Sequence, residues 1–307
     1  MIPKIIHYCW FGGNPLPELA QRCIASWRKY LPEYEVWLWV ENNANLNSNL
    51  NPRSATIGDA CRAKRGKNAN GNGNNDNLNH NPNGNGNLLF DKRMGFDVNM
   101  IPYTAEAYRR GKYAFVSDYA RFWILYKYGG LYFDTDVEVI RPMDDIIAKG
   151  AFMGFETDPD GKNSPLRYPS RYAFGINVGL GCGFEKENGF VKRMLEMYGG
   201  LTYEDPRTNP NLKTVVAHVT EALMEKGLEC KRGIQQVDGI TIYPREYFAP
   251  INVVTGRLHI TPNTRTIHQY MGSWTTGKGS WKERIRRNVP EWCLLLLNRI
   301  KRRINRR

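Results

Sequence analysis

The sequence predicts an α/β domain built on a mixed, mainly parallel sheet. Residues 4–10 form an apolar run of strand composition, and residues 34–40 form a second one. Between them, residues 17–30 carry apolar side chains at the three-to-four spacing of one helical face, and Pro17 suits a first helical turn. A strand, a helix and a second strand in this order begin a parallel sheet.

Length and composition set the broad class. A chain of 307 residues, 41% of them hydrophobic, is long enough for one large α/β domain or two small ones. The six cysteines show no Cys-x-x-Cys spacing and no histidine partner at zinc spacing, so we interpret them as reduced thiols. We expect no secretory signal and no membrane-spanning helix, because no long apolar run is present. These features predict a cytoplasmic protein.

Asparagine dominates residues 41–94, often at every second position, and apolar side chains become scarce there. Such a segment cannot bury enough surface to offset its ordering entropy, so we expect a disordered or weakly ordered insertion. A long loop is tolerated because closure entropy rises only logarithmically with length. We therefore expect one domain over residues 1–280, interrupted at 41–94, and a separate tail over 281–307.

The central stretch of the chain, residues 115–140, ends in two carboxylates. It is predicted to be an amphipathic helix, a turn at Gly129-Gly130 and a short buried strand that leads into Asp134 and Asp136. Alternate side chains of a strand share a face, so both carboxylates would reach one ion. Oxygen ligands of this kind suit Mg²⁺ or Mn²⁺. The alternative is an ordinary turn at a strand end, where aspartate is common.

Two further charged residues lie on the helix of this stretch. Asp118 and Arg121 fall mostly outside the apolar face that passes through Ala120 and Ile124. Asp118 is near the expected helix start, so a capping role is one interpretation. Arg121 stands three residues later and is suited to a salt bridge with Asp118.

The remaining ordered segments continue the α/β alternation. We expect helices over residues 105–112, 143–148, 188–198 and 211–226, and strands within 150–156, 239–247 and 266–270.

Three motifs occur in a fixed order along the chain. The opening motif spans residues 2–12, the central motif runs from Ser117-Asp118 through Arg121 and Gly129-Gly130 to Asp136, and the closing motif runs from His268 to Trp274. Together they resemble the family 32 glycosyltransferases, which include yeast-type initiating mannosyltransferases and bacterial capsular polysaccharide sugar transferases. The resemblance implies a single Rossmann-like nucleotide-sugar transferase domain of the GT-A type. The insertion at 41–94 departs from the family pattern, which has a shorter connection there.

The resemblance also implies roles for the charged residues. Asp134, Asp136 and His268 would hold Mn²⁺ or Mg²⁺, which stabilises the charge that develops on a departing diphosphate. Asp118 and Arg121 would hold the ribose or sugar hydroxyls of the donor and orient it. For His268, the residue pattern alone slightly favours a histidine packed in the core.

Other residues would contact the nucleotide sugar. Ligands bind at the carboxyl ends of strands in open α/β sheets, so Trp10 and Phe11 are placed to stack on a base, and Gly12 lets backbone approach the ligand. Trp10 is alternatively a core residue. Asn177 would lie beside the donor, although a turn asparagine fits the sequence as well. The closing Ser273 and Trp274 would form a lid over the diphosphate.

The net charge of +13 is concentrated at the end of the chain. Residues 281–307 contain ten Lys and Arg against Glu283 and Glu291, a net charge of +8, so the rest is only mildly basic. This distribution argues against nucleic acid as a partner. The tail also carries apolar residues, which predicts basic amphipathic helices, divided at Pro290, on an anionic membrane surface. It would place the protein peripherally on the inner face of the cytoplasmic membrane. The alternative is a helix packed on the domain.

These observations predict a metal-dependent glycosyltransferase, a hexosyltransferase that moves a sugar from a UDP- or GDP-sugar to a glycan or lipid-linked glycan. The resemblance implies retention of anomeric configuration and a role in surface polysaccharide synthesis such as capsule formation. A metal-dependent nucleotidyltransferase or phosphotransferase is one alternative, although no Gly-x-x-x-x-Gly-Lys-Ser/Thr loop is present. A non-catalytic protein that binds a membrane surface or a glycan is the other.

Overall fold

The computed structural model describes residues 1–42, 91–159, 174–205, 208–209, 212–253, 255–271, 290, 293–294 and 296. Three of the sequence predictions fall outside these residues: the interior of the insertion, the Ser273-Trp274 lid and nearly all of the basic tail.

The chain begins with the predicted strand, helix and strand. Strand β1 (Ile5–Cys9) is followed by α1 (Glu18–Tyr30) and β2 (Glu35–Glu41), and β1 pairs with β2 in parallel. Helix α1 buries Ala20, Cys23, Ile24 and Trp27, which lie at helical spacing on one face.

The insertion is shorter than predicted, because both of its ends are strand. Glu41 closes β2, and residues 92–94 belong to β3 (Lys92–Phe96), which pairs with β2 in parallel. Phe96 is the one fully buried side chain of this edge strand, and Lys92, Arg93 and Gly95 are exposed, so the sequence shows no apolar alternation there. Residues 43–90 lie outside the part of the chain that the structure describes.

The main sheet is mixed, as predicted. Its remaining strands are β4 (Gly130–Tyr132), β6 (Phe152–Thr157), β7 (Gly175–Asn177), β8 (Cys182–Phe184), β9 (Gln235–Val237) and β10 (Ile240–Tyr243). The order is β3-β2-β1-β4-β8-β6-β10-β9, with β7 paired to β6. Strands β1, β2, β3, β4, β6 and β10 run in one direction and β7, β8 and β9 run in the other.

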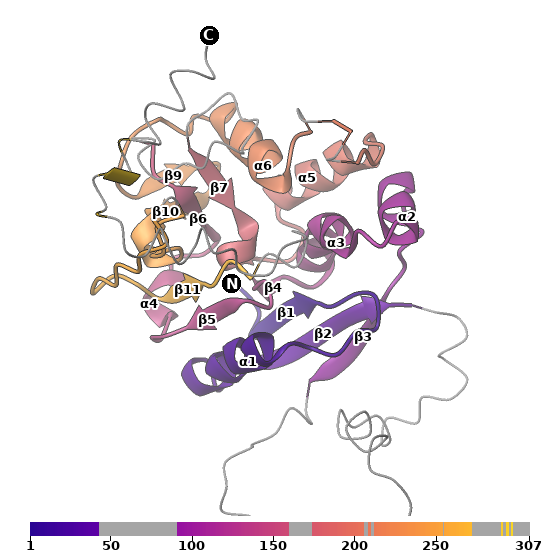
Figure 1. Ribbon diagram of the computed structural model, residues 1–307, viewed down its shortest axis with the longest axis horizontal. Helices are drawn as coiled ribbons and strands as arrows, with labels where there is room; N and C mark the ends of the chain where they lie inside the picture. Colours follow the sequence, from indigo (N-terminus) through magenta and orange to yellow (C-terminus); the bar gives the residue numbers. More distant parts are fainter. Residues whose placement is uncertain are drawn as a thin grey trace, which may run out of the picture.

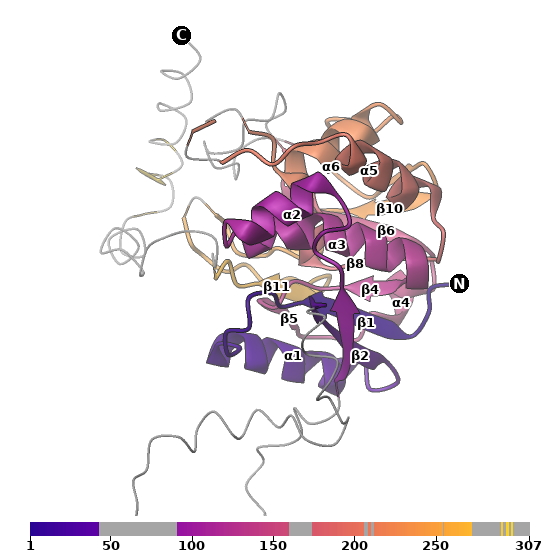
Figure 2. The ribbon, with the colours of Figure 1, turned by 90° about the vertical axis from the view of Figure 1, so that its right-hand side faces the viewer.

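Helices cover both faces of this sheet (Figures 1 and 2). Helices α2 (Pro102–Arg109), α3 (Tyr113–Tyr128), α5 (Gly189–Gly199) and α6 (Val215–Met224) contribute to the core on one face. Helix α1 packs on the opposite face with the short α4 (Asp144–Ile147). Residues of β1 alternate between the two cores, because Ile6 and Tyr8 face α1 whereas Cys9 faces α3. No helix in the described part of the chain is long and apolar enough to cross a membrane.

A second, two-stranded sheet brings together two distant parts of the chain. Strand β5 (Val137–Val139) directly follows the paired aspartates, and β11 (Thr266–His268) pairs with it antiparallel. Short 3-10 helices occupy Val178–Leu180 (η3), after β7, and Arg245–Tyr247 (η4), after β10.

Helix α3 differs from its prediction in two respects. It begins at Tyr113, so Asp118 lies in its second turn and is too far from the N-terminus to cap it. The Arg121 side chain is buried, although its position was predicted to lie mostly outside the apolar face. The burial is possible because α3 is covered by α2 and α5 as well as by the sheet, so most of its circumference faces the core.

Candidate active site

The paired aspartates lie in a turn between β4 and β5. Strand β4 ends at Tyr132, and the backbone N–H of Val137 donates to the carbonyl of Asp134 at 3.0 Å. The prediction that Asp134 and Asp136 share a face of one strand was therefore wrong. The turn, and not strand alternation, brings the two carboxylates together at the carboxyl end of β4.

His268 completes a cluster with the two aspartates. One ligand atom from each of Asp134, Asp136 and His268 lies within 4.8 Å of the other two. The register of the small sheet explains the contact, because His268 pairs with Val137, the residue after Asp136. A residue more than a hundred positions away is thus fixed next to the turn.

Asp136 is buried and strongly held. Its carboxylate accepts the backbone N–H of Met271 at 2.8 Å and lies 3.2 Å from Nε2 of His268. Burial opposes ionisation of Asp136, but His268 and the backbone amide outweigh it and lower the pKa to about 2. Burial likewise opposes the charged form of His268, and the charge and hydrogen bond of Asp136 outweigh it and raise the pKa to about 9.

The cluster suits a divalent cation. Nδ1 of His268 is a buried nitrogen without a hydrogen-bond partner among the described residues. Two carboxylates that point at one place repel each other unless a cation lies between them. Carboxylate oxygens suit Mg²⁺ and Mn²⁺, whereas an imidazole nitrogen suits a transition metal better than Mg²⁺.

Arg121 links the cluster to Asp118. Its guanidinium lies 3.1 Å from Oδ1 of Asp118 and 3.6 Å from Oδ1 of Asp134, with Nε donating to the carbonyl of Ser117 at 3.0 Å. It also lies over the ring of Tyr132, with 5.1 Å between the guanidinium carbon and the ring centroid. The predicted salt bridge with Asp118 is confirmed, and the same guanidinium also reaches Asp134.

The charges of this group shift the pKa values of Asp118 and Arg121. Burial raises the pKa of Asp118 to about 6, with Arg121 opposing the shift and Asp134 adding to it. Burial disfavours the charge of Arg121, but Asp134 and Asp118 outweigh it and raise its pKa. Arg121 is therefore a permanent cation beside the aspartates.

Gly179 leaves the space that Asp134 occupies. The backbone N–H of Asp134 donates to the Gly179 carbonyl at 3.0 Å. A Cβ on Gly179 would lie 2.0 Å from Oδ2 of Asp134, which is far inside contact distance.

Asn177 has a structural role in the turn that contains Gly179. Its Oδ1 accepts the N–H of Gly179 at 2.7 Å, which caps η3, and its Nδ2 donates to Oε1 of Glu156 at 3.2 Å. The turn interpretation of Asn177 is therefore confirmed, and contact with a donor remains a prediction. Glu156 was not singled out in the sequence.

The loop after β1 lies at the same edge of the sheet as the turn after β4, because the two strands are parallel neighbours. Trp10 is half-buried and its indole N–H donates to the Asn14 carbonyl. Phe11 is 4% exposed and packs against Phe96 at 5.8 Å between ring centroids, so a base could stack on Trp10 but not on Phe11.

Gly12 fits the same loop for a packing reason. Its φ is +90°, and a Cβ there would lie 2.2 Å from Cε2 of Tyr113 at the start of α3. Its N–H donates to Glu41 at 3.2 Å. The glycine thus lets the loop lie against the helix that carries Asp118 and Arg121.

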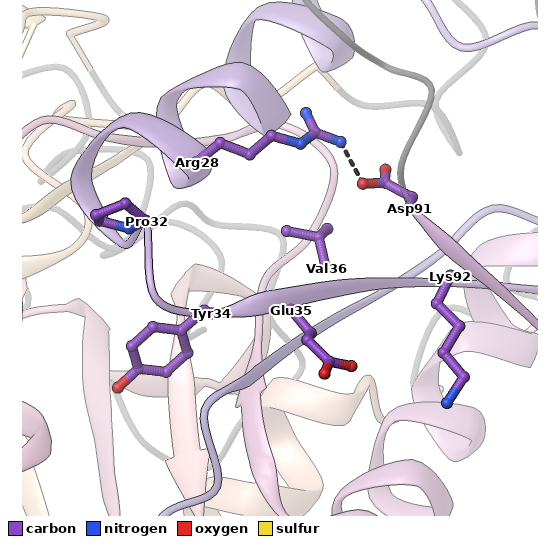
Figure 3. A pocket seen from close by; sticks show the side chains of 7 residues that line it. All are labelled: Arg28, Pro32, Tyr34, Glu35, Val36, Asp91 and Lys92. Atoms are coloured by element: carbon purple, nitrogen blue, oxygen red, sulfur yellow. Dashed lines mark hydrogen bonds and ion pairs between the residues drawn. The ribbon is translucent and has the colours of Figure 1, made fainter.

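A separate pocket lies at the opposite end of the parallel strands, where β2 and β3 begin (Figure 3). It is lined by residues at the end of α1 and at the starts of β2 and β3, including Arg28, Tyr34 and Lys92. Asp91 and Arg28 form an ion pair across it, and Asp91 also accepts the Tyr8 hydroxyl at 2.7 Å. Because the aspartates follow the carboxyl end of β4, this pocket belongs to a different part of the molecule.

A mixed sheet with an acidic cluster at the carboxyl end of a central strand fits the GT-A arrangement that the family 32 resemblance implies. Residues 17–153 match the family described as the glycosyltransferase sugar-binding region containing the DXD motif, a range that includes both aspartates of the motif. Over this range the chain is similar to the DXD-containing glycosyltransferases.

The chain is similar to two known proteins over different lengths. A stretch of 44 residues is 46% identical to inositol phosphoceramide mannosyltransferase 1 of Schizosaccharomyces pombe, and it spans 14% of this chain and 14% of that relative. The solved PaToxG glycosyltransferase is distantly similar, with a TM-score of 0.43 and 16% identity over 74% of this chain and 70% of that one.

Proposed function

We propose that this chain is a metal-dependent glycosyltransferase that moves a hexose from a UDP- or GDP-sugar to a glycan or lipid-linked glycan. The observation that supports it most is the convergence of Asp134, Asp136 and His268 within 4.8 Å of one another. In the proposal these three residues hold Mn²⁺ or Mg²⁺, and the imidazole favours Mn²⁺. When bound, the cation supplies positive charge to the departing nucleoside diphosphate.

Arg121 and Asp118 bind and orient the donor in this proposal. The guanidinium of Arg121 is already fixed by Asp118, Asp134 and the Ser117 carbonyl, so little entropy is lost when it binds a donor oxygen. Asp118 accepts a hydroxyl of the ribose or sugar. Both side chains come from one rigid helix, which keeps their spacing from the metal cluster constant.

The base lies against Trp10 in this proposal, because the half-buried indole borders the same edge of the sheet as the aspartates. Asn177 lies beside the sugar, and Ser273 and Trp274 close over the diphosphate. The resemblance to the family 32 enzymes supports retention of configuration and a role in surface polysaccharide synthesis.

Sugar release from UDP- and GDP-sugars tests the proposal. We expect the full chain with Mn²⁺ to hydrolyse one of these donors slowly to free sugar and nucleoside diphosphate. Asp136→Asn should reduce this rate at least about 100-fold, because it removes a charged ligand. Asp144→Asn, an exposed aspartate of α4, is the matched control and should keep the wild-type rate.

The products also separate the rival classes. Release of nucleoside monophosphate instead of free sugar would favour a nucleotidyltransferase or phosphotransferase. No turnover and no effect of Mn²⁺ across the donor panel would favour a non-catalytic binding protein.

The basic tail supports a peripheral position on the inner face of the cytoplasmic membrane, where a lipid-linked acceptor would be found. Its net charge of +8 attracts anionic lipid by roughly 1 kcal/mol per basic residue near the surface. We expect the full chain to sediment with vesicles rich in anionic lipid, and a chain that ends at Ser280 to remain in the supernatant. Equal sedimentation of the two would exclude a membrane role for the tail.

A further inference from the structure

Glu156 is a buried carboxylate on the strand next to the candidate metal site. It is 2% exposed and lies on β6, one residue before the strand ends. The pairing of β6 with β7 is regular up to Phe155 and resumes at Thr157 with a shifted register, so Glu156 is the extra residue of a β-bulge. Bulges next to active sites often re-aim a side chain.

The bulge directs Glu156 at the amide of Asn177. Oε1 of Glu156 accepts Nδ2 of Asn177 at 3.2 Å, and Oδ1 of Asn177 accepts the N–H of Gly179 at 2.7 Å. A hydrogen bond to a carboxylate is roughly twice as strong as one between neutral groups. The Asn177 side chain is therefore held at both ends, and its orientation fixes the turn at η3.

The turn at η3 contacts Asp134 directly. The Gly179 carbonyl accepts the Asp134 N–H at 3.0 Å, and the Gly179 Cα faces Oδ2 so closely that no Cβ would fit. A displacement of the turn would move the Asp134 carboxylate relative to Asp136. Glu156 also interacts electrostatically with His268.

We propose that Glu156 is a positioning residue for the metal site, acting through Asn177 and Gly179 to hold the Asp134 carboxylate beside Asp136 and His268. This inference rests on the proposed metal-dependent function. A buried carboxylate that only stabilises the fold would make the same hydrogen bond without affecting the metal. The two roles differ in whether metal affinity changes in a folded variant.

The affinity of the full chain for Mn²⁺, measured from the EPR signal of free Mn²⁺, separates these roles. Glu156→Leu removes the acceptor at similar volume and should weaken Mn²⁺ binding about 10-fold or more, the usual effect of losing a group that orients a ligand. Glu156→Gln keeps an acceptor for Asn177 and should stay within about 3-fold of wild type. Thr157→Val, at the next buried position of β6, is the matched control and should bind as wild type does.

A second variant tests the connection. Asn177→Ala should weaken Mn²⁺ binding as Glu156→Leu does, and the double variant should be no weaker than either single one, because both break one chain of contacts. If Glu156→Leu does not fold, the Mn²⁺ affinity of Asn177→Ala tests the inference by itself. The inference would be overturned if folded Glu156→Leu or Asn177→Ala bound Mn²⁺ within about 3-fold of wild type. It would also be overturned if the two effects were additive in the double variant. Wild-type protein that binds no Mn²⁺ would overturn the proposed function together with it.

Discussion

Arg121 is the residue on which the charges of the candidate site depend. It is a buried cation between the carboxylates of Asp118 and Asp134, at 3.1 and 3.6 Å. Removal of Arg121 would leave the Asp118 and Asp134 carboxylates without the positive charge that they share. Removing one partner of a buried ion pair strongly destabilises a protein, because the remaining charge stays buried without compensation.

Substitution of Arg121 should therefore affect stability as well as activity. We expect Arg121→Met to lower the free energy of unfolding by about 3 kcal/mol, measured by urea denaturation at pH 7. Arg121→Lys should recover only part of this loss, because an ammonium cannot reproduce the forked contacts. Arg109→Met, on the exposed face of α2, should change stability by less than about 0.5 kcal/mol. A loss below about 1 kcal/mol for Arg121→Met would show that the ion pairs are not stabilising.

Part of the site was predictable because its residues are close in sequence. Asp134 and Asp136 stand one residue apart after an apolar run, which is visible in any reading of the chain. His268 was predicted with the help of the closing motif, since no local pattern places it beside Asp136. Glu156 could not be predicted, because its role depends on a bulge, and bulges arise from strand pairing that one segment does not reveal.

At the scale of elements, His7 joins β1, β2 and the end of α3. Its Nδ1 accepts the indole N–H of Trp39 at 3.1 Å, and its Nε2 donates to the Gly129 carbonyl at 2.9 Å. Both bonds require a neutral imidazole with its proton on Nε2. Burial lowers the pKa of His7 to about 4, although the bond to Gly129 opposes the shift.

This histidine should make stability depend on pH. Its pKa is about 4 in the folded chain and about 6.5 when unfolded, so its stabilising effect is complete above pH 6.5 and is lost as pH falls toward 4. The difference amounts to roughly 3 kcal/mol over that window. In urea unfolding at pH 7.5 and pH 4.5, His7→Gln should show a smaller loss than wild type, since glutamine can keep both hydrogen bonds and does not titrate. Exposed His259→Asn is the control and should lose as much stability as wild type. Identical losses in wild type and His7→Gln would contradict this role.

The elements themselves were predicted unevenly, for physical reasons. Helix α1 and strands β1 and β2 were correct to within a residue or two, because their apolar side chains recur at a clear period. Residues 92–94 of β3 were assigned to the insertion, because none of their side chains is fully buried. The end of β4 was also placed too late, since a three-residue strand and the turn after it have the same composition.

At the scale of the whole molecule, the insertion joins two neighbouring parallel strands. The N–H of Asn42, just after β2, donates to the Phe96 carbonyl at the end of β3, whereas Lys92 at the start of β3 lies beside Trp37. Any connection from 42 to 91 must therefore travel back along the strand, roughly 17 Å at 3.3 Å per residue. Strand β3 matters to the site because Phe96 packs against Phe11 in the loop after β1.

Replacing residues 43–90 tests whether this segment does more than connect the strands. A linker of about 12 Gly and Ser residues reaches the required distance, so we expect this variant to fold and to bind Mn²⁺ as wild type does. It should gain about 1 kcal/mol of stability, because the loop becomes four times shorter and each halving saves about 0.6 kcal/mol.

The matched control is a linker of three residues, which spans at most about 14 Å and cannot reach. It should pull β3 from the sheet and expose Phe96, with a lower melting temperature and increased binding of a hydrophobic dye. If the longer linker instead abolished Mn²⁺ binding while the melting temperature held, residues 43–90 would contribute directly to the site. If it lowered the melting temperature as the short linker does, they would contribute to the core. An unchanged Mn²⁺ affinity together with an equal or higher melting temperature is the only result consistent with a segment that bridges β2 and β3 and contributes to neither the site nor the core.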